Sequence, residues 1–291
     1  MLQKMLLFLG LAGSLLLTSC QEDITLEVPP YENKLAVFCV LQPDSIPRLF
    51  LSRSKSYFDY TDKSEEYLYI KNAEVIIKDI TSGIIDTLKS DSGFILNDNG
   101  GRYYAYFYTG KYAAKIGHRY TLDIRHNGKH VTSETFVPKP VEITKVDYKV
   151  DSMSSNFDFY IKDPADESNG YNLVNIFTYT FWDGQQMRTI KNKYRENNFY
   201  YDKLKNGGEM AVNYYRDDDI RKQLDTSRTL YFYIENNTTQ TAEYLQSVWG
   251  QIYNGQDNFF TEPSIVKHNI TGGLGIFGAT TPAPEYKVVI K

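Results

Sequence analysis

Residues 119–137 read RYTLDIRHNGKHVTSETFV, and this stretch decides the fold class. Tyr120, Leu122 and Ile124 alternate with polar residues, a period of two that is typical of a β-strand with one buried face. The pair Asn127-Gly128 follows, and both residues tolerate the positive φ angles of a two-residue hairpin turn. The segment therefore predicts a β-hairpin.

Further strands are expected on both sides of this hairpin. Short runs of apolar, β-branched and aromatic residues recur with Gly, Pro and Asn between them, which is typical of a β-sandwich. We expect a β-sandwich domain over residues 35–140 and a second β-rich domain over 141–291. The other predicted strands are 35–41, 48–52, 73–80, 84–88, 102–108, 157–161, 171–181, 230–234 and 288–290.

One helix is predicted, near residues 239–253. Ala242, Leu245, Trp249 and Ile252 recur at spacings of three to four, which gives a helix one apolar stripe. The polar stretch 185–220 has few clear elements, and it is left open whether that stretch is a lid, a binding loop or an insertion.

The N-terminus has the pattern of an export signal, predicted over residues 1–19. A basic Lys4 precedes an apolar run of about 13 residues, shorter than the ~20 that cross a bilayer as a helix. Leu17-Thr18-Ser19-Cys20 resembles the lipobox of bacterial lipoproteins. That resemblance implies that diacylglycerol is attached to Cys20 and that residues 20–34 form a lipidated tether.

The residues after Cys20 indicate where such a lipoprotein goes. Gln21-Glu22-Asp23 resembles the short acidic signal that sends Bacteroidetes lipoproteins to the outer face of the outer membrane. The alternatives are inner-membrane retention and a plain solvated linker, and we expect surface export. The second cysteine, Cys39, then has no partner in the chain and is predicted to be a buried core residue.

The sequence contains no strong signal for catalysis, cofactors, metals or nucleic acid. A net charge of −4 argues against a nucleic-acid footprint. There is no GxSxG elbow, Walker loop, dinucleotide fingerprint or HExxH motif. His126 and His130 flank the hairpin turn and are predicted to be surface histidines, with a zinc site as the alternative. Asp217-Asp218-Asp219 is predicted to be a solvated turn, with a calcium site as the alternative.

Aromatic residues are abundant, with 25 Tyr and 16 Phe. Tyrosines on a surface suit protein partners and sugar faces, whereas on strands they also fill the core, and both alternatives stay open. The candidate partner or ligand contacts are Tyr57, Tyr60, Tyr194, Tyr200, Tyr201, Tyr214 and Tyr215. Three Asp-Ser/Thr-apolar triplets resemble the O-glycosylation motif of exported Bacteroidetes proteins, at Ser45, Thr87 and Ser152.

Several segments together resemble one family, the Bacteroidetes outer-membrane lipoproteins of the domain-of-unknown-function family numbered 4249. The clearest is the glycine-rich Asn269–Gly278, preceded by Glu262-Pro263. The others are Lys34–Phe38, Asn72–Ile77, Gly101–Tyr104, Gly117–Leu122, Asp163-Pro164 and Asn169–Asn172. The resemblance implies a transthyretin-like or immunoglobulin-like N-terminal sandwich, and no catalytic residues carry over from it.

The resemblance also implies a role. Genes of this family often sit beside TonB-dependent outer-membrane receptors, so we expect a non-enzymatic accessory of such a transporter in nutrient uptake. The alternative is a structural or adhesive surface lipoprotein that binds envelope components or glycans, because a fold alone does not decide function. A surface hydrolase is the third hypothesis.

Overall fold

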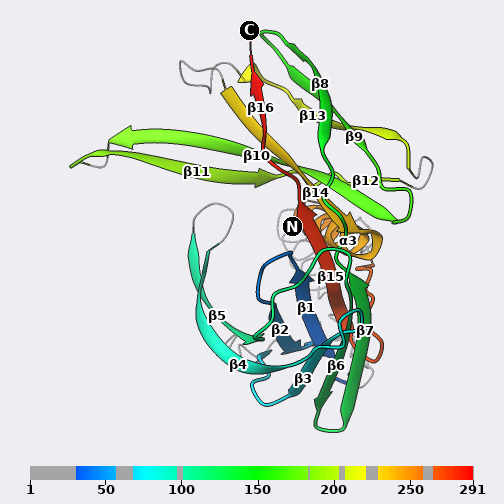
Figure 1. Cartoon of the computed structure of the whole chain (residues 1–291). Helices are drawn as coiled ribbons and strands as arrows, with labels where there is room; N and C mark the ends of the chain where they lie inside the picture. Colours follow the sequence, from blue (N-terminus) through cyan, green and yellow to red (C-terminus); the bar gives the residue numbers. More distant parts are fainter. Residues whose placement is uncertain are drawn as a thin grey trace, which may run out of the picture. The chain divides into compact units, whose positions relative to one another are not determined.

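The structure is a computed structural model that describes residues 31–56, 68–96, 101–182, 184–202, 207–220, 229–257 and 265–290. It is mainly β, as predicted, with a 13-stranded and a 3-stranded sheet (Figure 1). Asn33–Lys55 and Thr61–Lys291 form one compact unit, which contains every strand of the described part. Of the other unit, the structure describes Tyr31, Glu32 and Ser56.

The first half forms an antiparallel group in the order β1-β2-β5-β4-β3-β6-β7. The predicted hairpin is confirmed as β6 and β7, and Asn127 and Gly128 have φ angles of 46° and 77°. Tyr120, Leu122 and Ile124 point into the core, as their alternation predicts. The bounds are β1 (Leu35–Leu41), β2 (Arg48–Arg53), β3 (Glu74–Asp79), β4 (Ile85–Leu96), β5 (Arg102–Thr109), β6 (Arg119–His126) and β7 (Lys129–Phe136).

A strand from the end of the chain completes this group. β15 (Leu274–Pro282) pairs in parallel with β1 over six residue pairs. Immediately before β15, Thr271 and Thr132 of β7 exchange two backbone hydrogen bonds of 2.9 and 3.1 Å. The segment that ends in β15 thus contacts both β1 and β7, the first and last strands of this group. Ile270, Phe277 and Ala279 belong to the core of the first half.

The second half is sandwich-like around its own core. β11-β10-β14 continues the large sheet, while β13-β9-β8 forms the small one. Phe157, Phe159 and Phe232 are fully buried in this core, with Phe159 and Phe232 ring centroids 4.7 Å apart. The bounds are β8 (Ile143–Val150), β9 (Ser155–Lys162), β10 (Asn169–Trp182), β11 (Met187–Arg195), β12 (Tyr200–Tyr201), β13 (Glu209–Arg216), β14 (Thr229–Thr238) and β16 (Tyr286–Val289).

The predicted boundary between 35–140 and 141–291 stays a prediction. Two hydrophobic clusters lie broadly on its two sides, but the first cluster also takes in residues after 270. The large sheet runs through both halves, because β15 pairs with β1 on one edge and with β14 on the other. The two halves therefore have largely separate cores and one shared sheet.

The glycine-rich segment 269–278 brings the backbone of β15 close to that of β1. Gly275 has a φ of +101°, and a Cβ there would collide with the carbonyl oxygen of Val37. A Cβ on Gly273 would lie 2.7 Å from the carbonyl oxygen of Leu35. The glycines of this segment therefore permit a close backbone approach and, at Gly275, a positive φ.

The predicted helix is confirmed as α3 (Thr239–Asp257), which runs past the expected end at 253. The hydroxyl of Thr238 caps it by accepting a 3.3 Å hydrogen bond from the Thr241 amide. Ala242 is fully buried, but Leu245 and Trp249 are only half-buried and Ile252 is 44% exposed. The apolar stripe therefore enters the core only at its N-terminal end. None of the helices in the described residues has the length and apolar character needed to cross a membrane.

The expectation of few elements between 185 and 220 was wrong. This stretch contains β11, β12 and β13. The alternation in β11 is between charged and uncharged residues, as in Lys191-Asn192-Lys193-Tyr194, so apolar periodicity does not reveal the strand.

Candidate binding site

A cleft of about 810 Å³, here called the central cleft, lies among the described residues. Its walls come from β1 and β2, from the β4–β5 hairpin, from β11 and β14, and from α3. A volume in this range is typical of a pocket for one small molecule. The apolar side chains that line it include Phe38, Phe50, Ile95, Tyr103, Leu245 and Trp249, and its charged side chains are Arg48, Arg195 and Glu235.

Phe38 and Phe50 of the apolar wall belong to a row of neighbouring rings. The ring centroid of Phe50 lies 6.2 Å from those of Phe38 and Phe107, and Phe38 lies 6.2 Å from Tyr244 of α3. Phe38 is 40% exposed, which is high for a phenylalanine in the middle of a sheet. The row continues into a smaller hollow of about 320 Å³ that shares Phe38 and Phe50 with the cleft.

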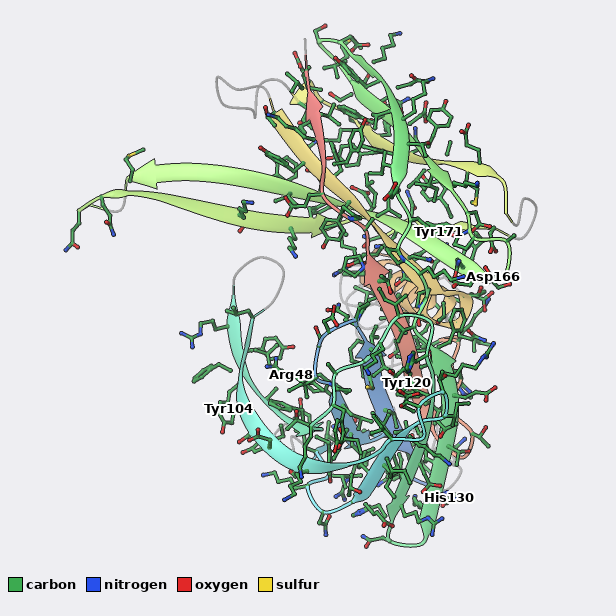
Figure 2. All side chains as sticks on the ribbon, in the orientation of Figure 1. Arg48, Tyr104, Tyr120, His130, Asp166 and Tyr171 are labelled. Atoms are coloured by element: carbon green, nitrogen blue, oxygen red, sulfur yellow. The ribbon has the colours of Figure 1, made fainter. Side chains whose placement is uncertain are left out.

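The strand period explains which aromatic residues face the cleft. Residues paired across an antiparallel ladder point to the same face, so Tyr103 shares its face with Ile95, and Tyr104 shares the opposite one with Phe94. Figure 2 shows Arg48 on the inner side of the curved β4–β5 hairpin and Tyr104 on its outer side. The inner face therefore contributes Ile95 and Tyr103 to the cleft.

The polar wall is built on a bidentate ion pair. Arg195 Nε lies 2.7 Å from Glu235 Oε2, and Arg195 Nη2 lies 2.8 Å from Glu235 Oε1. The Glu235 side chain is 6% exposed, and both of its oxygens are occupied by the guanidinium. The neighbouring Asn237 donates to Asn172 Oδ1 at 2.8 Å and to the Gly170 carbonyl at 3.1 Å. This wall is therefore fixed by side chains that already have partners.

Arg48 differs from Arg195 in its surroundings. Its guanidinium carbon lies 5.4 Å from the ring centroid of Phe107, and Arg48 itself is exposed. Among the described residues no carboxylate lies within ion-pair distance of Arg48. The ring of Phe107 attracts the guanidinium as a cation, and a cation–π contact does not use up its N–H donors.

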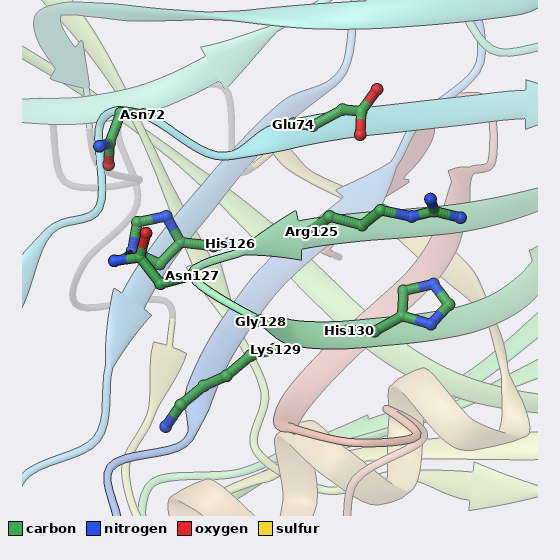
Figure 3. Close-up of a pocket in the computed structure, with 8 residues that line it drawn as sticks. All are labelled: Asn72, Glu74, Arg125, His126, Asn127, Gly128, Lys129 and His130. Carbon is green, nitrogen blue, oxygen red and sulfur yellow. Dashed lines mark hydrogen bonds between the residues drawn. The ribbon is translucent and has the colours of Figure 1, made fainter.

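A second hollow, of about 700 Å³, lies over the β6–β7 turn (Figure 3). His126 and His130 line it, but Figure 3 shows their rings at opposite ends. His130 Nε2 lies 2.8 Å from Asp123 Oδ2, and this hydrogen bond lowers the pKa of Asp123. Across the part of the chain that the structure describes, no group of three or more His, Cys, Asp or Glu side chains is arranged to hold a metal ion.

The tyrosines predicted as contacts divide into three groups. Tyr194 and Tyr215 are 52% and 57% exposed, so their rings are accessible to a partner. Tyr200 and Tyr201 are half-buried and donate to the Asn213 carbonyl and to Gln246 Oε1, at 2.9 and 2.8 Å. Tyr214 is 2% exposed and packs in the second core, so it is a core residue and not a surface contact. Tyr57 and Tyr60 lie outside the described residues.

The remaining candidates are covalent sites and the second cysteine. Ser45, Thr87 and Ser152 are all exposed, and their O-glycosylation stays a prediction. Cys20 lies outside the described residues. Cys39 is fully buried in the first core, as predicted, and burial raises the pKa of its thiol to about 12.

The charged residues of the central cleft were not identified from the sequence. Arg48 belongs to a predicted strand to which no role was assigned, and Arg195 lies in the stretch without assigned elements. The signal that identifies Arg195 is the basic alternation Lys191, Lys193, Arg195, which places three cations on one strand face. No local sequence pattern identifies Glu235, because its ion-pair partner Arg195 is 40 residues away in the sequence.

Comparison with family models identifies the family of this chain. The family model described as "Domain of unknown function (DUF4249)" matches residues 21–284, which is most of the chain. No curated protein matches.

Proposed function

The chain belongs to the DUF4249 family, and from that premise we propose that it is a surface-exposed outer-membrane lipoprotein that assists a TonB-dependent transporter in nutrient uptake. The observation that carries the proposal is an open, aromatic-walled cleft of about 810 Å³ in a chain whose sequence carries a lipobox-like motif. A lipid anchor keeps such a body beside the transporter and raises its effective concentration there without a new contact.

The proposal is of a binding protein and not an enzyme. Among the described residues, Glu235 is the one carboxylate that lines the central cleft, and both of its oxygens accept hydrogen bonds from Arg195. A carboxylate that acts as a general base or nucleophile needs a free lone pair within reach of the substrate. The arrangement therefore favours holding a ligand over transforming it.

The lipid anchor gives the first testable prediction. Cys20→Ser removes the thiol that a lipobox requires, so we expect the variant to lose its membrane association and the diacylglycerol mass. The measurement is membrane fractionation with intact-mass analysis, and Cys39→Ser is the matched control because Cys39 is buried in the core. Equal membrane retention of both variants would contradict the anchor.

The uptake role is tested in the host. A strain that lacks the gene is grown in media in which one class of nutrient at a time limits growth, and it is complemented with the wild-type or the Cys20→Ser gene. We expect a growth defect with at least one nutrient class, restored by the wild-type gene alone. Equal growth of all strains in every medium would count against an accessory role.

A second candidate function, adhesion to glycans or envelope components, is favoured by one surface. On the outer face of the β4–β5 hairpin, Phe94 and Tyr104 are 64% and 54% exposed, and their ring centroids lie 5.4 Å apart. Tyr106 continues the row at 5.8 Å from Tyr104. Exposed aromatic rings stack on sugar faces and on protein partners. The test is a glycan array with the wild type and Tyr104→Ala. Absence of binding by both proteins would exclude adhesion to the glycans on the array.

A further inference from the structure

We propose that the central cleft binds a small amphipathic organic anion. Its apolar or aromatic body lies among Phe38, Phe50, Tyr103 and Trp249, and its acidic group is held by Arg48. The biological meaning of this ligand, as cargo for a transporter, rests on the proposed function, but the binding itself is a property of this chain.

The size of the cleft favours one small molecule. Pockets for cofactors and small ligands are about 300–1,000 Å³ and are mostly apolar, with a few polar groups that set the orientation. The central cleft, at about 810 Å³, has both features: aromatic walls and one exposed guanidinium.

The charges that line the cleft favour an anion. Arg195 and Glu235 neutralise each other through two hydrogen bonds, so the net charge of the described lining comes from Arg48. A guanidinium offers paired N–H donors that fit the two oxygens of a carboxylate, sulfonate or phosphate. Because Phe107 already holds the guanidinium of Arg48, little side-chain freedom is lost when an acid binds.

The sheet face next to the cleft is also positively charged. Lys191, Lys193 and Arg195 alternate along β11 and therefore share one face. Lys191 and Lys193 lie over Tyr231 and Tyr233, at 5.9 and 5.4 Å from the ring centroids. This basic face attracts anions toward the cleft, whereas a neutral molecule gains nothing from it.

The test uses two fluorescent probes with the same ring system. Anilinonaphthalene sulfonate carries one acidic group, and phenylnaphthylamine is the same body without it. The protein is the chain from Gln21 onward, purified without detergent, because the compact unit Asn33–Lys55 and Thr61–Lys291 contains the whole cleft. We expect saturable binding of one sulfonate probe per chain, with at least about tenfold higher affinity than the neutral probe.

Variants assign the contacts. Arg48→Gln is expected to lower the affinity for the sulfonate probe by about 10- to 100-fold, because a charged hydrogen-bond donor is lost. The affinity for the neutral probe is expected to change by less than about twofold, because that probe has no acidic group for Arg48 to bind. Tyr103→Ala is expected to lower the affinity for both probes, because the side chain of Tyr103 lines the cleft and is 50% exposed. Arg119→Gln is the matched control, because Arg119 is also exposed and stacks on a phenylalanine, Phe136 at 5.7 Å, but does not line the cleft.

Two results would overturn the inference. One is equal affinity of the two probes for the wild type. The other is an unchanged affinity of the sulfonate probe for Arg48→Gln, with circular dichroism showing that the variant is folded. Neither result bears on whether the lipoprotein associates with a transporter, so failure of the ligand class and failure of the proposed function remain distinguishable.

Discussion

Gly275→Ala is expected to lower the free energy of unfolding by about 2–5 kcal/mol. The wild-type φ of +101° is strained for any residue with a side chain, and the added methyl group would collide with the carbonyl oxygen of Val37. Relief requires β15 to move away from β1, where the two strands pair over six residue pairs. Native domains are stable by about 5–15 kcal/mol, so this single methyl group removes a large share of the total.

The control for this prediction is another glycine within a strand. A Cβ added to Gly93 of β4 would meet no heavy atom within 4 Å, and the φ of Gly93 is not positive. Gly93→Ala is therefore expected to change the free energy of unfolding by less than about 1 kcal/mol. Urea unfolding followed by circular dichroism gives both values, and equal midpoints for the two variants would contradict the close approach of β1 and β15.

Arg195→Met is expected to cost about 3–5 kcal/mol of stability. The substitution leaves Glu235, with a side chain that is 6% exposed, as a buried carboxylate that has lost both guanidinium hydrogen bonds. The double variant Arg195→Met with Glu235→Leu removes both charges and is expected to recover most of the loss, because no buried charge is left unpaired. The measurement is again the free energy of unfolding in urea.

A second bidentate pair provides the control. Arg216 Nε and Nη2 lie 2.8 and 2.9 Å from the two oxygens of Asp218, but the Asp218 side chain is 43% exposed. Arg216→Met is expected to cost no more than about 1 kcal/mol, because water solvates the remaining carboxylate. If Arg195→Met and Arg216→Met had the same small effect, the polar wall of the cleft would not be a buried ion pair.

The sequence was sufficient for the parts of the fold that are local. Alternation and the Asn-Gly turn predicted β6 and β7, and the three-to-four spacing predicted α3. The partner of a strand is not a local property. Nothing in residues 269–278 shows that this segment pairs in parallel with β1, which lies more than 200 residues earlier.

The candidate site was harder to predict for the same reason. Its residues come from β1, β2, β4, β5, β11, β14, β15 and α3, so no short motif contains them. Trp249 illustrates the limit: its helical spacing predicted that it belongs to an apolar stripe, but not that this part of the stripe lines a cleft. Cys39 is the opposite case, because a cysteine inside an apolar run indicates burial, and its side chain is fully buried.

The central claim, an accessory role at a transporter, is tested most directly by copurification. Tagged wild-type protein is extracted from native outer membranes in mild detergent, and the proteins that accompany it are identified and quantified by mass spectrometry. The account predicts a large TonB-dependent barrel in near-equal amount with the wild type, and its loss with Cys20→Ser. Recovery of the intact, folded protein without any barrel would contradict the claim and favour a free-standing adhesive protein.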